Sequence, residues 1–174
     1  MKKYELTNET KLWLGKSLHR IKALADFGDV AAGDIGGWVE KEENLSQVGN
    51  AWVYGNAQVY GDAQVYDNAR VCGDAWVCGN AQVCGDARVC GNAWVCGNAQ
   101  VYGNADYLVI GPIGSRGDMT TFFNTANGTI FVKCGCFRGD IDAFRAKVAE
   151  THGDNKHAKA YLAAADLAVI RIGR

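Results

Sequence analysis

Apolar and polar positions recur with a period of six residues through the centre of the chain. Residues 53–106 consist of nine consecutive copies of Val-(Tyr/Cys)-(Gly/Asp)-(Asn/Asp)-Ala-x, with no insertion between copies. In an extended segment the alanine and the valine two residues later point to one side, and the residue between them points to the other. The pair before each alanine accepts positive φ, so the chain turns a corner every six residues. Three sides and three corners predict a triangular coil of 18 residues, with residue i stacked on residue i+18 at about 4.8 Å.

The six-residue period is absent on the N-terminal side of the repeats. Residues 18–24 are predicted to form a strand. Turns are predicted at Gly28-Asp29, Gly33-Asp34 and Gly36-Gly37. A β-solenoid of three or four coils is too thin to be stable with bare ends, so the flanking segments are expected to cap it. We therefore assign residues 1–46 to an N-terminal β cap and entry coil, and residues 47–106 to the repeat helix.

The period is also lost after Asp106, where the pattern predicts a hairpin and two helices. Residues 120–124 and 129–137 are β-rich and are joined through Asn127-Gly128, a strong hairpin signal. Predicted helix N-caps are Asp140 for the first helix, which stops at Gly153, and Asp154 or Asn155 for the second. Apolar residues share one face of each helix: Ile141, Phe144 and Val148 in the first, and Ala158, Tyr161, Leu162, Ala165 and Val169 in the second. Residues 107–174 are thus expected to form a small ββαα cap.

The repeat itself resembles a known family. The hexad 53–58 resembles the hexapeptide-repeat superfamily of left-handed parallel β-helices, with Val53 at the aliphatic position and Ala57 at the small one. Segments 25–27, 36–39 and 44–47 look like an uncharacterised bacterial branch of that superfamily that carries a transferase label. Segments 110–118, 134–137 and 152–153 resemble phage and prophage proteins. The resemblance implies a mainly β chain: a left-handed parallel β-helix with a small α+β C-terminal cap, in a superfamily where trimerisation through the faces is common.

Charge and hydropathy exclude several partner classes. The formal net charge is −1, and no basic stripe marks a nucleic-acid surface, so nucleic acid is not an expected partner. No apolar run approaches the ~20 residues that a membrane helix requires, and no apolar segment follows the N-terminal lysines. We expect a cytoplasmic protein that does not engage a membrane.

The cysteines follow the repeat. Five of the seven cysteines occupy the position that tyrosine fills in other copies: Cys72, Cys78, Cys84, Cys90 and Cys96. We interpret them as interchangeable surface side chains with free thiols, which is typical of a reducing compartment, and not as a disulfide framework.

Stacking at 18 residues predicts three outward ladders of different chemistry. The ladders and their neighbours are Trp52, Arg70, Arg88 and Asp106; Gln58, Trp76 and Trp94 with Tyr60; and Gln64, Gln82 and Gln100. Trp76 and Trp94 are the best candidates for a contact with a protein partner, because exposed tryptophans usually mark an interface. The alternatives are that a cap folds over these rings or that they are an accident of repeat duplication. Arg70 and Arg88 either bind an anionic partner or, as we favour, are satisfied internally by Trp52 and Asp106.

Residues that carry chemistry are sparse. Acyltransferases of the resembled superfamily use a histidine on or beside a coil, whereas His19, His152 and His157 all lie outside the hexads. We therefore expect no catalytic residues of that type and no cofactor. Cys134 and Cys136 with His152 and His157 are a ligand set that zinc favours, but Cys-x-Cys is shorter than the usual spacing. The alternative is that both cysteines lie on one packed face of a strand.

The sequence favours a non-enzymatic, rigid β-helical scaffold that binds another protein or itself, with a homotrimer as the expected oligomer. The phage resemblance adds an accessory role, such as blocking a host defence factor. The first alternative is an acyl- or nucleotidyl-transferase whose donor is held between subunits. The second is a small-molecule sponge that uses pockets between subunits of a trimer.

Overall fold

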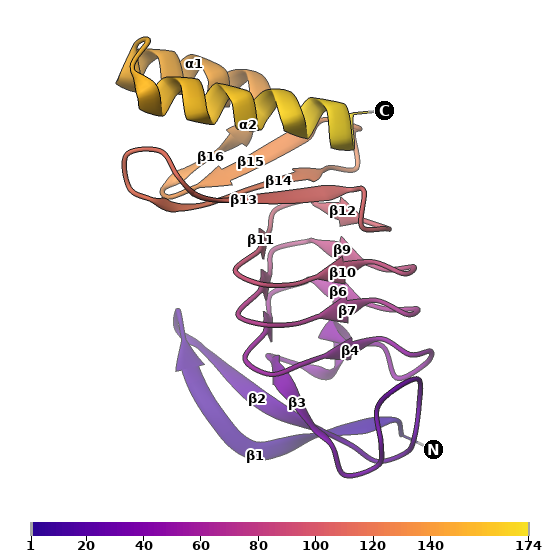
Figure 1. Cartoon of the computed structure of the whole chain (residues 1–174). Coiled ribbons are helices and arrows are strands. Elements are labelled where there is room, and N and C mark those ends of the chain that lie inside the picture. The colour runs from indigo at the N-terminus through magenta and orange to yellow at the C-terminus, as the bar shows by residue number, and fades with distance from the viewer. Residues whose placement is uncertain (1, 174) are drawn as a thin grey trace. The chain divides into compact units, whose positions relative to one another are not determined.

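The computed structural model describes residues 2–173, which divide into an N-terminal unit ending at Asn104 and a C-terminal unit beginning at Ala105. The N-terminal unit is mainly β and holds the repeats (Figure 1). The C-terminal unit combines a β-sheet with two helices.

The repeats form a parallel β-solenoid built from very short strands. The strands are β4 (Trp52–Val53), β5 (Gln58–Val59), β6 (Gln64–Val65), β7 (Arg70–Val71), β8 (Trp76–Val77), β9 (Gln82–Val83), β10 (Arg88–Val89), β11 (Trp94–Val95) and β12 (Gln100–Val101). Each pairs in parallel with the strand 18 residues later, as Gln58 pairs with Trp76 and Trp76 with Trp94. The predicted 18-residue coil is therefore confirmed (Figure 1). The left-handed sense remains a prediction from the family resemblance.

The solenoid core is the double column of valines and alanines that the period predicts. Every repeat valine from Val53 to Val101 and every repeat alanine from Ala57 to Ala99 is at most 1% exposed. The corners require glycine where the coils stack, because a Cβ on Gly79 would lie 2.9 Å from the backbone nitrogen of Gly97. Gly79 also has a φ of 69°, in the left-handed region.

The N-terminal cap is continuous with one face of the solenoid. Its strands are β1 (Tyr4–Trp13), β2 (Lys16–Ala23) and β3 (Ile35–Val39), paired antiparallel in that order. β3 then pairs in parallel with β5, so the sheet runs β1-β2-β3-β5-β8-β11. β2 confirms the predicted strand over 18–24. β1 was not predicted, because its central residues are polar and mostly exposed and show no alternation of apolar and polar positions.

The entry coil is two residues longer than the repeat. Val39 pairs with Val59 and Leu45 bridges to Val65, an offset of 20 residues in both cases instead of 18. Val39 and Leu45 are six residues apart, whereas Leu45 and Val53 are eight apart, so the extra residues lie between Leu45 and Val53.

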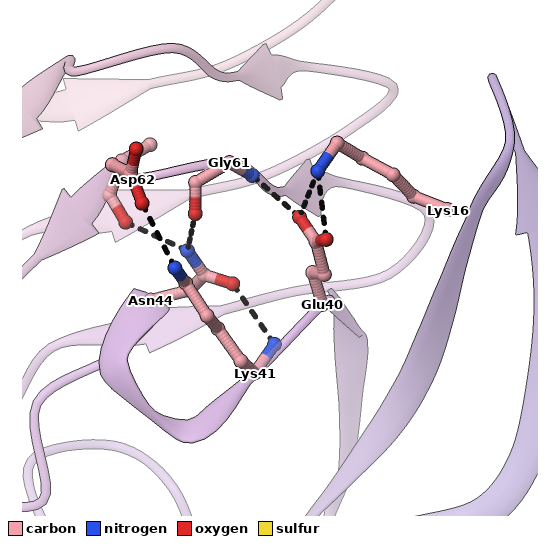
Figure 2. A network of polar contacts seen from close by, with 7 residues as sticks. Lys16, Glu40, Lys41, Asn44, Gly61 and Asp62 are labelled. Carbon is pink, nitrogen blue, oxygen red and sulfur yellow. Dashed lines mark hydrogen bonds and ion pairs between the residues drawn. The ribbon is translucent and has the colours of Figure 1, made fainter.

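A polar network joins this entry coil to the second corner of the repeats, Gly61-Asp62 (Figure 2). The short 3-10 helix η1 (Glu42–Asn44) places Asn44, which is fully buried, under that corner. The Asn44 amide donates to the carbonyls of Gly61 at 3.0 Å and Ala63 at 2.9 Å, and its oxygen accepts from the Lys41 backbone at 3.0 Å. Glu40 pairs with Lys16 at 2.7 Å and accepts from the Gly61 backbone. The side chain of Asn44 thus supplies a donor where the backbone of the entry coil turns away.

The C-terminal unit is a helix-covered antiparallel sheet (Figure 1). Its elements are β13 (Tyr107–Ile113), β14 (Asp118–Asn124), β15 (Ile130–Cys134), β16 (Phe137–Asp140), α1 (Ile141–His152) and α2 (Lys156–Ile172). The predicted hairpin is confirmed as β14 and β15, which pair from Asn124 and Ile130. The expected ββαα arrangement is incomplete, because β13 and β16 extend the sheet to four strands within residues 105–173.

Both helices begin at predicted caps. The Asp140 carboxylate accepts from the backbone of Ala143 at 2.7 Å, and the Asn155 side chain accepts from Ala158 at 3.1 Å. The apolar faces pack on the sheet in one core that includes Phe122, Val132, Phe144, Val148, Ala158, Tyr161, Ala165, Ala168 and Ile172. The prediction for Val169 is wrong, since this side chain is 44% exposed and Ala168 and Ile172 are buried instead.

Candidate functional site

Three tryptophans form a ladder on the solenoid face that continues into the N-terminal cap. Trp76 and Trp94 lie on neighbouring coils and pack edge to face, with ring centroids 4.8 Å apart. Trp13, at the end of β1, packs edge-on against Trp76, also at 4.8 Å. Trp76 and Trp94 are half-buried. We call these three residues the tryptophan ladder. One alternative from the sequence was that a cap folds over these rings, and the N-terminal hairpin does so in part through Trp13.

The neighbours of the ladder are more buried than the sequence suggested. Tyr60 was expected beside the tryptophans on the outer face, but it is only 6% exposed. Burial, and after it a hydrogen bond with Cys78, raises the pKa of Tyr60 well above its ordinary value. The indole N–H of Trp94 donates to the sulfur of Cys78 at 3.4 Å. The inner side of the ladder is therefore packed, while the rings of Trp76 and Trp94 are partly exposed.

The turn that joins β1 to β2 places exposed apolar side chains next to the ladder. Leu12 is 79% exposed and Leu14 is 70% exposed, on either side of Trp13. We call residues 12–15 the hairpin tip. Leu14 has a φ of 47°, a left-handed conformation that is unusual for leucine. Leu12 precedes Trp13 in β1 and therefore points to the face of the hairpin opposite the ladder, so the hairpin tip presents an exposed leucine away from its own ladder. Exposed apolar side chains gathered in this way usually mark a contact surface.

The predicted tryptophan and arginine ladder is largely internal. Trp52 occupies the outward position of its hexad, in register with Arg70, but it is only 1% exposed because the cap covers it: Phe27 and Tyr4 pack against it with centroids at 5.3 and 6.1 Å. Arg70 pairs with Asp29 at 2.8 Å. A hydrogen bond from Tyr54, followed by smaller effects that include Arg70, lowers the pKa of Asp29.

At the other end of that ladder, the contact of Arg88 with Asp106 stays a prediction. Asp106, the expected neighbour of the arginines, is buried in the C-terminal unit, where the amide of Asn124 donates to it at 3.3 Å. Arg88 is exposed, and its backbone N–H donates to the side chain of Asn104 at 2.8 Å. The internal partner of Arg70 is therefore Asp29, a cap residue that the repeat pattern does not reveal.

The five repeat cysteines are not surface thiols. Cys72 and Cys90 form a disulfide with their Cα atoms 4.6 Å apart, the spacing of stacked coils. Cys78, Cys84 and Cys96 are buried. The prediction of exposed, interchangeable thiols is wrong because the cysteine comes directly after each two-residue strand, where the chain begins to turn. The side chain there packs against the outward residue 16 positions later, as Cys78 packs on Trp94.

The candidate zinc ligands do not form a metal site. Cys134 ends β15 and its sulfur accepts from the hydroxyl of Thr120 at 3.2 Å, whereas Cys136 is exposed in the next turn. The alternative of one packed strand face is therefore also wrong, because the strand ends between them. The rings of His152 and His157 are 6.1 Å apart. Within residues 2–173, no group of three or more His, Cys, Asp or Glu side chains is arranged to hold a metal ion.

Two further observations bear on the function classes. His19 lies in β2, where its Nδ1 is 3.2 Å from the carbonyl of Thr7, so it lies in the cap and not on a repeat coil. Neither α1 nor α2 has the length and hydrophobicity to cross a membrane, and the described part of the chain contains no other helix of that kind.

Comparison with known proteins agrees with the repeat architecture. The model of the YdcK beta solenoid repeat matches residues 63–79 and 81–97. The central repeats are similar to the YdcK β-solenoid repeat. Over 62 residues the chain is 39% identical to the Escherichia coli (strain K12) protein named Uncharacterized acetyltransferase YdcK. The aligned part covers 31% of this chain and 19% of that relative, so the chain spans about a fifth of the relative's length. The resemblance to a β-helix family with a transferase label is confirmed.

Proposed function

We propose that this chain is a non-enzymatic β-solenoid scaffold that assembles with copies of itself through the tryptophan ladder and the hairpin tip. The observation that carries the proposal is the pair of exposed apolar features at this end of the chain: the leucines of the hairpin tip, Leu12 and Leu14, and the tryptophan ladder. Each of these leucines is at least 70% exposed, and the rings of Trp76 and Trp94 are half-buried. A tryptophan contributes on the order of 200 Å² of contact area when it is covered, so this surface gains much from a partner.

The solenoid suits a scaffold because its backbone is rigid. The parallel hydrogen bonds repeat without interruption from coil to coil, as in Gln58 to Ala75 and Trp76 to Ala93, both near 2.9 Å. The ladder residues are therefore held at fixed spacing, which lowers the entropic cost of binding.

The expected assembly is a homotrimer. A hairpin tip that contacts the ladder of a neighbouring copy is a heterologous contact, and such contacts close into rings when the rotation allows. Trimerisation is also common in the hexapeptide-repeat superfamily that the repeats resemble. The occupant of the apolar surface is thus a second copy of this chain. An accessory role in a phage, as the resemblance of the C-terminal segments implies, is compatible with such an assembly.

A transferase activity is the alternative, because the relative aligned over the 62 residues is named an acetyltransferase. Residues 53–106 contain no histidine that could act as the general base on a coil. The scaffold proposal therefore fits the repeats better than the alternative does. Titration with acetyl-CoA separates the two, since stoichiometric binding would favour the transferase.

The test is the mass of the purified chain in solution, measured by light scattering after size exclusion. Wild type is expected to run as a trimer, and the double variant Leu12→Ser/Leu14→Ser and the single variant Trp94→Ser as smaller species with unchanged circular dichroism. Val48→Ser is the matched control, because Val48 is also 79% exposed but lies in the turn before β4. A monomeric wild type, or variants that keep the wild-type mass, would contradict the proposal.

A further inference from the structure

The C-terminal unit contains a cleft of about 580 Å³ that none of the functions above uses. It lies between the β13–β14 loop, the β15–β16 turn and helix α1, with Arg116, Cys136, Phe137, Phe144, Lys147 and His152 in its lining. This volume is within the range of about 300–1,000 Å³ that is typical of small-molecule sites. The lining residues come from four separate parts of the sequence, since Tyr161 of α2 also contributes, so the cleft is a product of the fold.

One wall of the cleft is aromatic and closely packed. The ring of Phe144 lies 5.4 Å from Phe137 and 5.7 Å from Tyr161, centroid to centroid. Tyr161 is seated directly against the β13–β14 loop, because a Cβ on Gly114 would lie 1.9 Å from its ring. Burial, followed by the neighbouring Cys134, raises the pKa of Tyr161 to about 12, so its hydroxyl stays protonated at neutral pH. This wall therefore offers the faces and edges of aromatic rings, with a hydroxyl at one edge.

The lining of the cleft also carries positive charge. The guanidinium of Arg116 lies across the β15–β16 turn, where a Cβ on Gly135 would come within 3.1 Å of its Nη1. No carboxylate among residues 2–173 forms an ion pair with Arg116. Arg138 and Lys147 add positive charge to the lining, and Asp118 adds a carboxylate. Lys147 also pairs with Glu150 on the exposed side of α1. An arginine without an ion pair beside an apolar wall favours an anionic ligand.

We propose that this cleft binds a small organic anion with a flat aromatic body. The phosphate or carboxylate of the ligand accepts hydrogen bonds from Arg116, and the aromatic body packs along Phe137 and Phe144. This inference is independent of self-assembly, because every residue that it uses belongs to the C-terminal unit.

The cleft contains its own reporter, Cys136. This thiol is exposed in the lining, where Cys134 is half-buried; Cys78, Cys84 and Cys96 are buried, and Cys72 is bonded to Cys90. A ligand in the cleft should therefore slow the alkylation of Cys136 by iodoacetamide, which peptide mass spectrometry measures residue by residue. The probes are phenyl phosphate, benzoate, inorganic phosphate and phenol, so that the body and each type of anionic group are tested separately.

We expect phenyl phosphate or benzoate to protect Cys136 in a saturable way, and inorganic phosphate and phenol to protect it at least roughly tenfold more weakly. Whichever of phenyl phosphate and benzoate protects at the lower concentration identifies the anionic group. Arg116→Met should raise the dissociation constant by about tenfold or more, because hydrogen bonds to a charged group are lost. Arg145→Met is the matched control, since Arg145 pairs with Asp166 at 2.7 Å outside the lining and its loss should change nothing.

A second variant tests the cleft without changing its charge. Thr151→Trp introduces a large ring on the exposed part of α1 that lines the cleft, and it should abolish protection while circular dichroism stays unchanged. The proposal is overturned if neither aromatic anion protects Cys136 at 10 mM, on the order of ten times the weakest affinity expected of such a site. It is also overturned if folded Arg116→Met and Thr151→Trp variants bind as wild type does.

Discussion

The buried side chain of Asn44 offers a direct test of how the repeats are closed at their N-terminal end. Along the solenoid each alanine carbonyl accepts from the backbone of the preceding coil, as Ala81 accepts from Gln64. At the entry coil the backbone N–H of Asn44 turns away to Lys41, and the side-chain amide of Asn44 donates to Ala63 in its place (Figure 2). Asn44→Ala removes this donor and leaves the carbonyls of Gly61 and Ala63 without it.

The magnitude follows from the burial of these bonds. One of the three side-chain hydrogen bonds of Asn44 is fully buried and two are partly buried. An unsatisfied buried polar group costs about 1–3 kcal/mol, and water can partly satisfy the two outer groups. We therefore expect Asn44→Ala to lower the free energy of unfolding by about 2–4 kcal/mol. Asn44→Asp should be no better, because its carboxylate would face carbonyl oxygens.

Urea unfolding followed by tryptophan fluorescence measures this change. All five tryptophans lie before residue 104, so the signal reports the N-terminal unit alone. Asn56→Ala is the control, because Asn56 is exposed and donates only to Asp74 at 3.3 Å, and its loss should cost less than about 0.5 kcal/mol. A difference below about 1 kcal/mol between the two variants would refute the role assigned to Asn44.

Three further changes have defined outcomes. Gly37→Ala would place a Cβ 2.6 Å from both the Ala57 carbonyl and Val53, so we expect a loss of about 2–3 kcal/mol in urea unfolding, and an unchanged midpoint would contradict the close approach. Val77→Asp puts an unpaired charge at a position that is fully buried, and circular dichroism should show loss of the β-solenoid, whereas a folded variant would overturn the assignment of the core. Burial lowers the pKa of Lys3 from 10.5 to about 8, so the folded state releases this proton before the unfolded chain does. Stability should therefore rise between pH 8 and 9.5, and Lys3→Met should remove the rise; equal slopes in both proteins would contradict it.

The repeat coils could be predicted from the sequence because their physical cause is local and periodic. The spacing of Val and Ala by itself determines which side chains face inward, and it correctly predicted the pairing of Trp76 with Trp94. The same 18-residue stacking also places Cys72 over Cys90, so this disulfide could have been predicted from the sequence. The longer entry coil was visible too, in the spacing of eight between Leu45 and Val53.

The burial of the outer faces was not predictable in the same way. Trp52 has the same place in its hexad as Arg70, and only the tertiary contacts with Tyr4 and Phe27 make it internal. Trp13 reaches the ladder from β1, a strand whose polar sequence carries no periodic signal. The cleft of the C-terminal unit likewise joins Arg116, Cys136 and His152 across the sheet and α1, and no local motif links these residues.

The central claim is that the solenoid assembles with itself through the tryptophan ladder and the hairpin tip. Native mass spectrometry of the gently purified full chain tests it most directly, because one spectrum reports subunit number, retained small molecules and bound protein. We predict that the wild-type protein has three times the 18.7-kDa chain mass and that the Leu12→Ser/Leu14→Ser variant has a lower mass. A monomer that carries a stoichiometric coenzyme A species would contradict it and favour the transferase alternative.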